Sequence, residues 1–447
     1  MDLSECENMI EIPDLSKATN LEILDLSNCK SLVMLPSTIG NLQKLYTLNM
    51  EECTGLKVLP MDINLSSLHT VHLKGCSSLR FIPQISKSIA VLNLDDTAIE
   101  EVPCFENFSR LMELSMRGCK SLRRFPQIST SIQELNLADT AIEQVPCFIE
   151  KFSRLKVLNM SGCKMLKNIS PNIFRLTRLM KVDFTDCGGV ITALSDPVTT
   201  MEDQNNEKIN KVEKRPKCDK DEDDEDEYEY EYDEDEDDED EYGEIYFKFQ
   251  NCFKLDRAAR ELILGSCFKT TMVLPGGEVP TYFKHQAYGN SLTVTLPQSS
   301  LSHKFLRFNA CLVVEPITHS FACMDVLFQF NGEHYRHTIY EGMEMMCKTD
   351  HLVLCSFKFQ PTGLLSKLDV NDVEFKFNGT RVKRCGIRLL NVSTSPDDSE
   401  GSSETESPDD SDGDSVTEYH QQSGEKCDDV ETESSKKRMR VSLLPLF

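Results

Sequence analysis

The first 190 residues repeat one pattern of apolar and polar positions, L-x-x-L-x-L-x-x-C/T, in which the apolar positions stay apolar and the others vary. The pattern occurs eight times, as LEILDLSNC at 21–29, LYTLNMEEC at 45–53, LHTVHLKGC at 68–76, IAVLNLDDT at 89–97, LMELSMRGC at 111–119, IQELNLADT at 132–140, LKVLNMSGC at 155–163 and LMKVDFTDC at 179–187. Apolar positions that alternate with polar ones are typical of a strand with one buried face. A solenoid with one strand per repeat is therefore predicted.

The closing Cys or Thr recurs every 21 to 24 residues from Cys6 onward, and a proline follows it by six or seven residues in most repeats. Because proline lacks an N–H, it suits the irregular backbone opposite the strands. This frame and period are those of leucine-rich repeats, which we expect over residues 1–196 as about eight repeats. Met1–Cys6 aligns with Leu24–Cys29, so the first repeat is expected to be truncated and the chain to be a piece or truncated product of a longer protein.

Two rows of outward side chains are predicted to line the concave face of this solenoid. The middle row holds the fifth residue of each frame and is polar throughout: Asp25, Asn49, His72, Asn93, Ser115, Asn136, Asn159 and Asp183. The outer row lies two positions later and is chemically mixed: Ser27, Glu51, Lys74, Asp95, Arg117, Ala138, Ser161 and Thr185. A rigid sheet with mixed solvent-facing side chains suits macromolecular recognition. The candidate partner-binding residues are the whole middle row with Ser27, Glu51, Lys74, Asp95 and Arg117.

The repeated Cys or Thr favours packing over chemistry. A small buried side chain with a weak donor can satisfy backbone groups where the chain leaves the strand. Cys104 and Cys147 are assigned to packing as well. Because no Cys/His cluster has zinc spacing, no metal site is predicted.

Charge changes this picture in two places. The net charge of -26 comes from residues 219–244, with 20 carboxylates and one Lys, and from residues 397–440, with 15 carboxylates and five Lys/Arg. A linker with an acidic low-complexity tract is predicted at 197–244, and an acidic tail at 393–447; both are expected to be disordered. The tail ends in a basic cluster that is a nuclear-localisation candidate: Lys436, Lys437, Arg438 and Arg440. Since neither a signal peptide nor a long apolar run is present, a cytoplasmic or nuclear location and no membrane partner are expected.

From residue 245 to residue 392 the pattern changes to short apolar or alternating runs separated by turn signals. Eight strands are predicted, beginning at Tyr246, Thr271, Ser291, Phe305, Met324, His351, Val373 and Val382, with one helix over 253–264. Strands at this spacing indicate an all-β sandwich or jelly roll.

These residues resemble a known family. The repeats, such as LPSTIGNLQKLYTLNMEEC at 35–53 and SIAVLNLDDTAIEEVP at 88–103, are similar to those of plant TIR–NBS–LRR immune receptors. The runs FQNCFKLDRAARELIL at 249–264, VLPGGEVPTYFKHQAYGNSLTVTLP at 273–297, FNACLVV at 308–314 and RCGIRLL at 384–390 resemble that family's C-terminal jelly-roll/Ig-like domain, C-JID. The resemblance implies the sensor half of a receptor, which engages a pathogen effector or a host protein in defence.

The resemblance does not carry enzymatic activity into this chain. The family's TIR and nucleotide-binding modules are not found, because no G-x-x-x-x-G-K-[ST] occurs, so neither NAD cleavage nor ATP binding is expected. No catalytic residue and no cofactor site is predicted. Pro275–Pro280 could be a phosphate-binding loop, but its glycines are better explained as supplying positive φ in a tight turn.

Two functions remain in competition. In the first, the chain binds a protein ligand through the repeats and the C-terminal domain, with a full-length immune receptor as a further possible partner and no direct contact with nucleic acid; no signalling activity of its own is expected. In the alternative, it is a nuclear acidic leucine-rich-repeat protein that holds basic partners such as histones. The folded domain after the acidic tract favours the first, since a histone-binding acidic protein needs none.

Overall fold

The computed structural model describes the following residues: 1–60, 65–83, 86–101, 105, 108–189, 192–193, 246–265, 271–297, 306–318, 321–330, 333–359, 372–379 and 381–390. The acidic tract, the acidic tail and the basic cluster at Lys436–Arg440 lie outside these residues. Their predicted disorder and nuclear import stay predictions.

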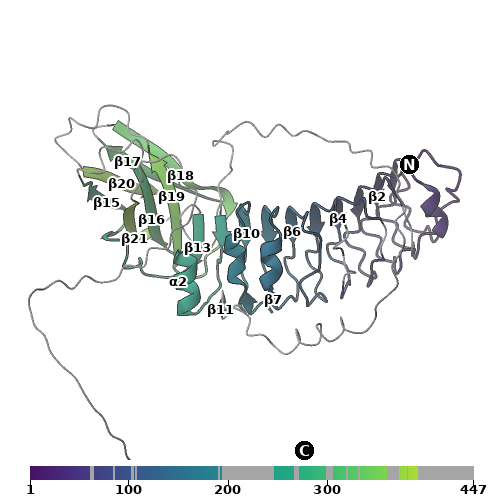
Figure 1. The fold of residues 1–447 in the computed structure, drawn as a ribbon, viewed down its shortest axis with the longest axis horizontal. Coiled ribbons are helices and arrows are strands. Elements are labelled where there is room, and N and C mark those ends of the chain that lie inside the picture. Colours follow the sequence, from purple (N-terminus) through teal and green to yellow (C-terminus); the bar gives the residue numbers. More distant parts are fainter. Residues whose placement is uncertain are drawn as a thin grey trace, which may run out of the picture. The chain divides into compact units, whose positions relative to one another are not determined.

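The repeats form the parallel sheet that the frame predicts, with one three-residue strand in each (Figure 1). The strands pair in sequence order and in register, so that each middle-row residue lies beside the next. They are β1 (Ile23–Asp25), β2 (Thr47–Asn49), β3 (Thr70–His72), β4 (Val91–Asn93), β5 (Glu113–Ser115), β6 (Glu134–Asn136), β8 (Val157–Asn159) and β10 (Lys181–Asp183).

From Cys29 onward the repeated Cys and Thr are buried and hydrogen-bonded, as predicted, whereas Cys6 is exposed. Cys163 donates from Sγ to the carbonyl of Leu137 in the preceding repeat, at 3.1 Å, and Thr140 donates to the same carbonyl at 2.8 Å. The same Cys-to-carbonyl bond recurs at Cys29, Cys53, Cys76, Cys119 and Cys187. Burial raises the pKa of the Cys53 and Cys76 thiols to about 12, which keeps them protonated donors. Cys147 is exposed, so its predicted packing role is wrong.

The residue before each Cys or Thr adopts a left-handed backbone, which turns the chain out of the strand. Asn28, Asp96 and Asp186 have φ near 60°, and Gly118 has φ of 74°. A Cβ on Gly118 would also collide with the Asp96 carboxylate of the neighbouring repeat. Glycine and the short Asx residues suit this position because they tolerate positive φ best.

The side opposite the repeat strands carries shorter elements. Among the described residues, 3-10 helices lie there at Ser37–Asn41, Cys147–Lys151 and Pro171–Arg175, together with a small parallel sheet of β7 (Gln144–Val145), β9 (Asn168–Ile169) and β11 (Thr192–Ala193). This irregular backbone is where the proline pattern predicted it.

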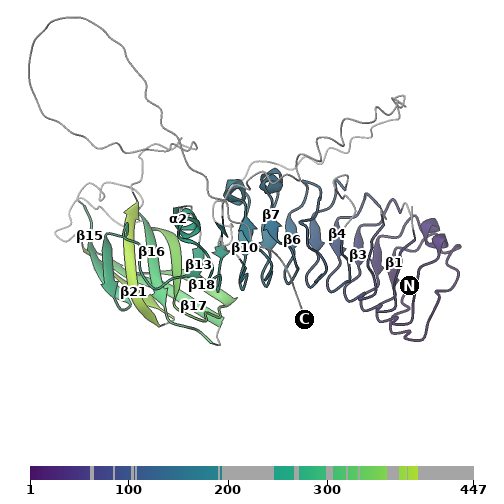
Figure 2. The same ribbon diagram turned by 90° about the horizontal axis from the view of Figure 1, so that it is seen from below.

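The repeat sheet continues across the long insertion into the C-terminal region. Strand β12 (Tyr246–Lys248) pairs in parallel with β10, and β13 (Thr271–Pro275) pairs in parallel with β12. Cys252 donates to the carbonyl of Phe184 at 3.0 Å, which is the bond that the other repeats make. Helix α2 (Arg257–Gly265) lies on the edge that carries the 3-10 helices (Figure 2). Residues 246–252 therefore form a further repeat, although the sequence had assigned them to the sandwich.

Strand β13 joins the two architectures, because its other edge pairs antiparallel with β19. The large sheet then runs β13–β19–β16–β21–β14, and a second sheet has the order β15–β20–β17–β18. The bounds are β14 (His285–Tyr288), β15 (Ser291–Thr295), β16 (Leu306–Val314), β17 (Phe321–Phe330), β18 (Glu333–Glu344), β19 (His351–Phe359), β20 (Asp372–Asn378) and β21 (Val382–Leu390). This confirms the solenoid followed by a β-sandwich. Strands β14 and β18 were not predicted, because charged and histidine side chains interrupt their apolar alternation.

Two hydrophobic cores lie on opposite faces of the shared sheet. One runs from Ile12 through the repeats and on to Met272, Leu274 and Leu354. The other fills the space between the sandwich sheets and includes Val273, Phe308 and Phe375. Successive residues of β13 thus belong to different cores, as the alternation of a strand requires.

Candidate recognition surface

The middle row has a structural task that the sequence did not reveal. The Asp25 carboxylate accepts the N–H of Ser27 at 2.9 Å, and Asn159 accepts that of Ser161 at 3.0 Å. Asn49, Asn93, Asn136 and Asp183 make the same bond to the residue two positions on. These side chains satisfy an amide where the strand ends, as Asx turns do. Their polarity therefore follows partly from the backbone, and all of them are half-buried.

His72 and Ser115 are the middle-row residues without that bond to the residue two positions on. The His72 Nδ1 is buried with no hydrogen-bond partner among the described residues, and Oε1 of Glu51 lies 4.0 Å from it. Ser115 donates to Asp95 at 2.5 Å. Asp95 also accepts the N–H of Arg117 at 2.8 Å, which ties the two rows together.

The outer row provides the exposed charges. Lys74 and Arg117 are exposed, whereas Ser27, Glu51 and Asp95 are half-buried. The Arg117 Nε lies 3.7 Å from an Asp139 carboxylate oxygen. Lys74, Arg117, Lys120 and Lys164 line one hollow of about 700 Å³ with Asp95, Asp96 and Asp139. The structure thus brings Lys74, Asp95 and Arg117 together, in a hollow with cations and anions in nearly equal number.

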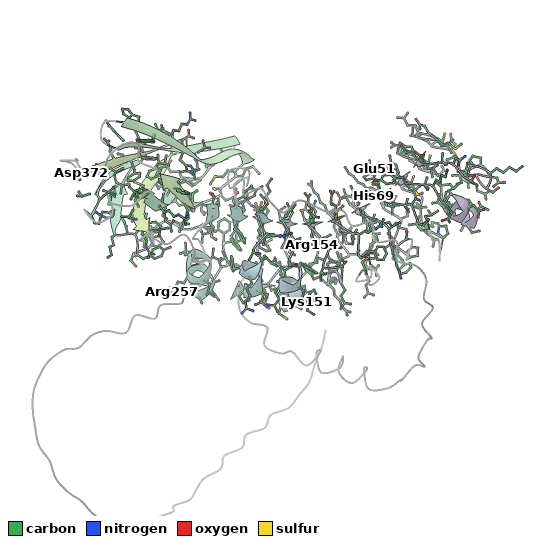
Figure 3. The ribbon with its side chains drawn as sticks, turned by 45° about the horizontal axis from the view of Figure 1, so that its top comes forward. Glu51, His69, Lys151, Arg154, Arg257 and Asp372 are labelled. Atoms are coloured by element: carbon green, nitrogen blue, oxygen red, sulfur yellow. The ribbon has the colours of Figure 1, made fainter. Side chains whose placement is uncertain are left out.

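A third set of exposed side chains was missed by the sequence analysis. They lie two or three positions before the middle row, and some of them are apolar: Ile23 is 56% exposed, Tyr46 48% and Met112 37%. The Tyr46 and His69 rings are stacked with centroids 4.7 Å apart. Figure 3 shows Glu51 and His69 along one edge of the repeats and Lys151 along the opposite edge. Extending the strand alternation by two residues would have found Ile23, whereas Tyr46, His69 and Met112 lie one position earlier than that alternation reaches. The stacked rings add aromatic contact area to the polar rows.

A second hollow, of about 830 Å³, lies where the repeats meet the sandwich. Its lining continues the strand rows with Asp183, Thr185 and Lys248, and the sandwich adds Met346 and Lys348. The Lys248 side chain is only 9% exposed, and its Nζ lies 3.9 Å from Asp183 and 5.2 Å from the Tyr246 ring centroid. Burial raises the pKa of Tyr246, so its hydroxyl stays protonated. The Thr185 hydroxyl is buried with no hydrogen-bond partner in the described part of the chain.

Asn251 and His351 fasten this junction. The Asn251 N–H donates to Nε2 of His351 at 3.0 Å, and the other ring nitrogen, Nδ1, lies 2.8 Å from the Thr349 carbonyl oxygen. The Asn251 amide donates to Asp186 and to the Met346 carbonyl and accepts the N–H of Lys348. Burial lowers the pKa of His351, which keeps the ring neutral and able to accept. The last repeat and the sandwich are therefore held by side chains as well as by the sheet.

The described residues supply no sign of metal or membrane chemistry. In the described ranges, no group of three or more His, Cys, Asp or Glu side chains could hold a metal ion. No described helix combines the length and the apolar composition needed to cross a bilayer. Pro275–Pro280 lacks the positive φ predicted for its glycines. Instead, a Cβ on Gly276 would come within 2.9 Å of Leu352, so this glycine permits close packing.

Comparison with known proteins supports the two architectures. Residues 274–395 match the C-JID domain family and residues 20–42 the Leucine Rich Repeat family. The Arabidopsis thaliana disease resistance protein RPP5 is 49% identical over 407 residues, which cover 88% of this chain and 24% of that protein. The Arabidopsis thaliana protein SUPPRESSOR OF npr1-1, CONSTITUTIVE 1 is 52% identical over 87% of this chain and 28% of its own length. Disease resistance protein RPS6 of the same plant is 31% identical over 84% of this chain and 28% of its own length. The chain spans about a quarter of the length of these relatives.

Proposed function

This chain is homologous to the repeat and C-JID portion of plant TIR–NBS–LRR disease resistance proteins, and we propose that it is a recognition module that binds a pathogen effector or a host protein. The proposed surface runs from the stacked Tyr46 and His69, along the hollow at Lys74 and Arg117, to the junction at Lys248. Both folded parts contribute to it.

The observation that carries the proposal is a pair of unpaired polar atoms, one on Thr185, which lines the hollow at the junction, and one on His72 of the middle row. The buried Nδ1 of His72 and hydroxyl of Thr185 have no hydrogen-bond partner in the described residues. Burial of a polar atom without a partner costs free energy, and a ligand that supplies the partner recovers it. Because the strands and the Asn251–His351 bonds already hold this surface, little ordering free energy is lost on binding.

The charge distribution favours a partner that is recognised through the local arrangement of its charges rather than through its net charge. Lys74 and Arg117 line one hollow together with Asp95 and Asp139, so a complementary surface needs charges of both signs. The alternative function, retention of basic proteins such as histones, depends on the acidic tract and not on this surface. The C-JID match at 274–395 supports the first function.

The test is a comparative co-purification from plant tissue exposed to a pathogen. The Lys74→Glu/Arg117→Glu double variant reverses two exposed charges of the hollow, and the control, Lys151→Glu/Arg154→Glu, reverses two exposed charges outside it. We expect to find a partner that binds the wild type and the control equally. The hollow variant should bind it at least tenfold more weakly, which corresponds to about 1.4 kcal/mol of binding free energy. Urea midpoints should agree within error among the three, since exposed substitutions change stability by about 0.5 kcal/mol or less.

Equal retention by all three proteins would place the binding surface elsewhere. Capture of histones by all three, lost only on deletion of residues 219–244, would favour the alternative function.

A further inference from the structure

A cleft of about 820 Å³ opens on the face of the large sheet that the repeats bury. It lies between α2, the segment from Pro275 to Phe283 and strands β19, β16 and β21. In the repeats, loops and 3-10 helices cover this face. In the C-terminal region, α2 and the Pro275–Phe283 segment cover it, and the cleft remains between them. The buried face of the sheet thus borders a cavity here.

The cleft has an apolar floor. Leu264, Leu274, Leu352 and Leu354 line it, and Leu274 and Leu352 are buried members of the core that runs through the repeats. The segment that forms its wall packs tightly on the sheet, because a Cβ on Gly386 would come within 2.6 Å of Val279. A hollow of this volume, with apolar walls and a few polar groups, has the properties of a small-molecule site.

Hydrogen-bond donors without acceptors line the same cleft. Asn309 is 8% exposed, and its Oδ1 accepts from Ser356 at 2.6 Å. Its amide nitrogen, which carries two donors, has no acceptor among the described residues. The Nε of Arg260 is likewise buried with no partner within the described ranges. Because buried donors are normally satisfied, the buried Arg260 Nε and the unpaired Asn309 amide in one cleft together indicate a ligand rich in acceptors.

The charges of the lining favour an anion. Arg257 forms a 2.7 Å ion pair with Glu261 on α2 and is thereby neutralised. Arg260 and Arg388 make no ion pair with any described residue, and Glu278 is the remaining carboxylate of the lining. The Arg388 guanidinium lies 5.7 Å from the Tyr282 ring centroid at the mouth of the cleft. Guanidinium and amide N–H groups together match the two oxygens of a carboxylate.

We propose that this cleft binds a small organic carboxylic acid. Its apolar body lies against Leu264, Leu352 and Leu354, and its carboxylate accepts from Arg260, Arg388 and the Asn309 amide. This site is separate from the proposed protein-recognition surface, because its lining lies on the opposite face of the sheet.

The strand that carries Arg388 provides a matched control. Arg384 lies four residues earlier on β21, on the same face, and its guanidinium lies 4.6 Å from the Tyr288 ring centroid. Arg384 does not line the cleft. Arg384→Gln and Arg388→Gln thus remove the same charge from the same kind of aromatic contact, and they differ in access to the cleft.

The experiment uses the fluorescent apolar anion 8-anilinonaphthalene-1-sulfonate with the full chain. We expect the probe to bind saturably and decanoate to displace it. Decanol has the same tail without the carboxylate, and at least tenfold more of it should be needed for the same displacement. Arg388→Gln and Arg260→Gln should each weaken binding of the probe about tenfold, and Arg384→Gln less than twofold. Urea midpoints of the variants establish that each is folded.

Three results would overturn the proposal: equal displacement by decanol and decanoate, equal loss in Arg384→Gln and Arg388→Gln, or unchanged affinity in both cleft variants. Displacement by the acidic peptide acetyl-Glu-Leu-Glu-amide at a lower concentration than decanoate would also overturn it, because the site would then read a protein segment.

Discussion

The repeat region and the C-terminal region share one sheet but use its two faces in opposite ways. In the middle row of the repeats, Asp183 faces solvent, its neighbour Lys248 on β12 is almost covered, and Val273 on β13 is 1% exposed in the second core. The opposite face is closed in the repeats and open at the cleft beside Arg388. A strand position therefore becomes surface or core according to the layer that covers it, and not according to the strand itself.

Because the repeat core continues through Phe249 into the sandwich, the two regions should lose stability together. Their distinct folds would otherwise predict separate unfolding.

The largest effect is expected from Phe249→Ala. Phe249 is fully buried and stacked on Phe184, with ring centroids 5.3 Å apart. The cavity should lower the free energy of unfolding by about 3–5 kcal/mol. Hydrogen exchange should report lost protection both in β8 and in β16. The control is Phe375→Ala in the second core, which should affect β17 and β20 first. Loss confined to the repeats in Phe249→Ala would show that the regions are independent.

A smaller effect is expected at the junction itself. Asn251→Ala removes three side-chain hydrogen bonds and places alanine at φ of 58°, for a loss of about 2–4 kcal/mol. Asn159→Ala removes an Asx bond and a bond from Ser161 within one repeat, and should cost about 1–2 kcal/mol. Urea denaturation measures both. If the two variants lost equal free energy of unfolding, the Asn251 hydrogen bonds would contribute no more to stability than those within one repeat.

The smallest effect is a pH dependence at His351. Burial lowers the pKa of His351 below its ordinary 6.5, so the unfolded chain binds a proton that the folded chain excludes. The contribution of neutral His351 to the free energy of unfolding is present above pH 6.5 and is lost as the pH falls toward the pKa of the folded state. The hydrogen bond to the Thr349 carbonyl and the charge of Asp350 oppose the lowering of the His351 pKa, and the pKa of His337 is also lowered by burial. Urea midpoints should therefore decrease as the pH is lowered below 6.5.

Substitution separates these two histidines. His351→Gln should flatten part of that slope, because glutamine can still accept from Asn251 without titrating. An unchanged slope in His351→Gln would assign the pH dependence to His337 or other groups.

The sequence predicted the repeat strands well because each repeat is a local unit with a fixed period. The outward orientation of Lys74 and Arg117 followed from alternation alone. The Asx bonds of Asn49 and Asn159 were missed, because they depend on where a strand ends rather than on its pattern. The exposed apolar side chains of Ile23 and Tyr46 were missed because the predicted concave face was taken from the polar positions of the frame.

The sequence by itself determined the inward ladder of Leu, Met, Cys and Thr, since these residues recur at a period that only a stacked solenoid can bury. Tertiary structure alone decided that Tyr246–Lys248 continues that solenoid across the insertion, that Val273 turns from surface to core, and that Arg260, Arg388 and Asn309 line one cleft. The physical reason is that a period records only contacts between neighbouring repeats. The junction and the cleft are built from segments about 50 to 130 residues apart, which no local pattern connects.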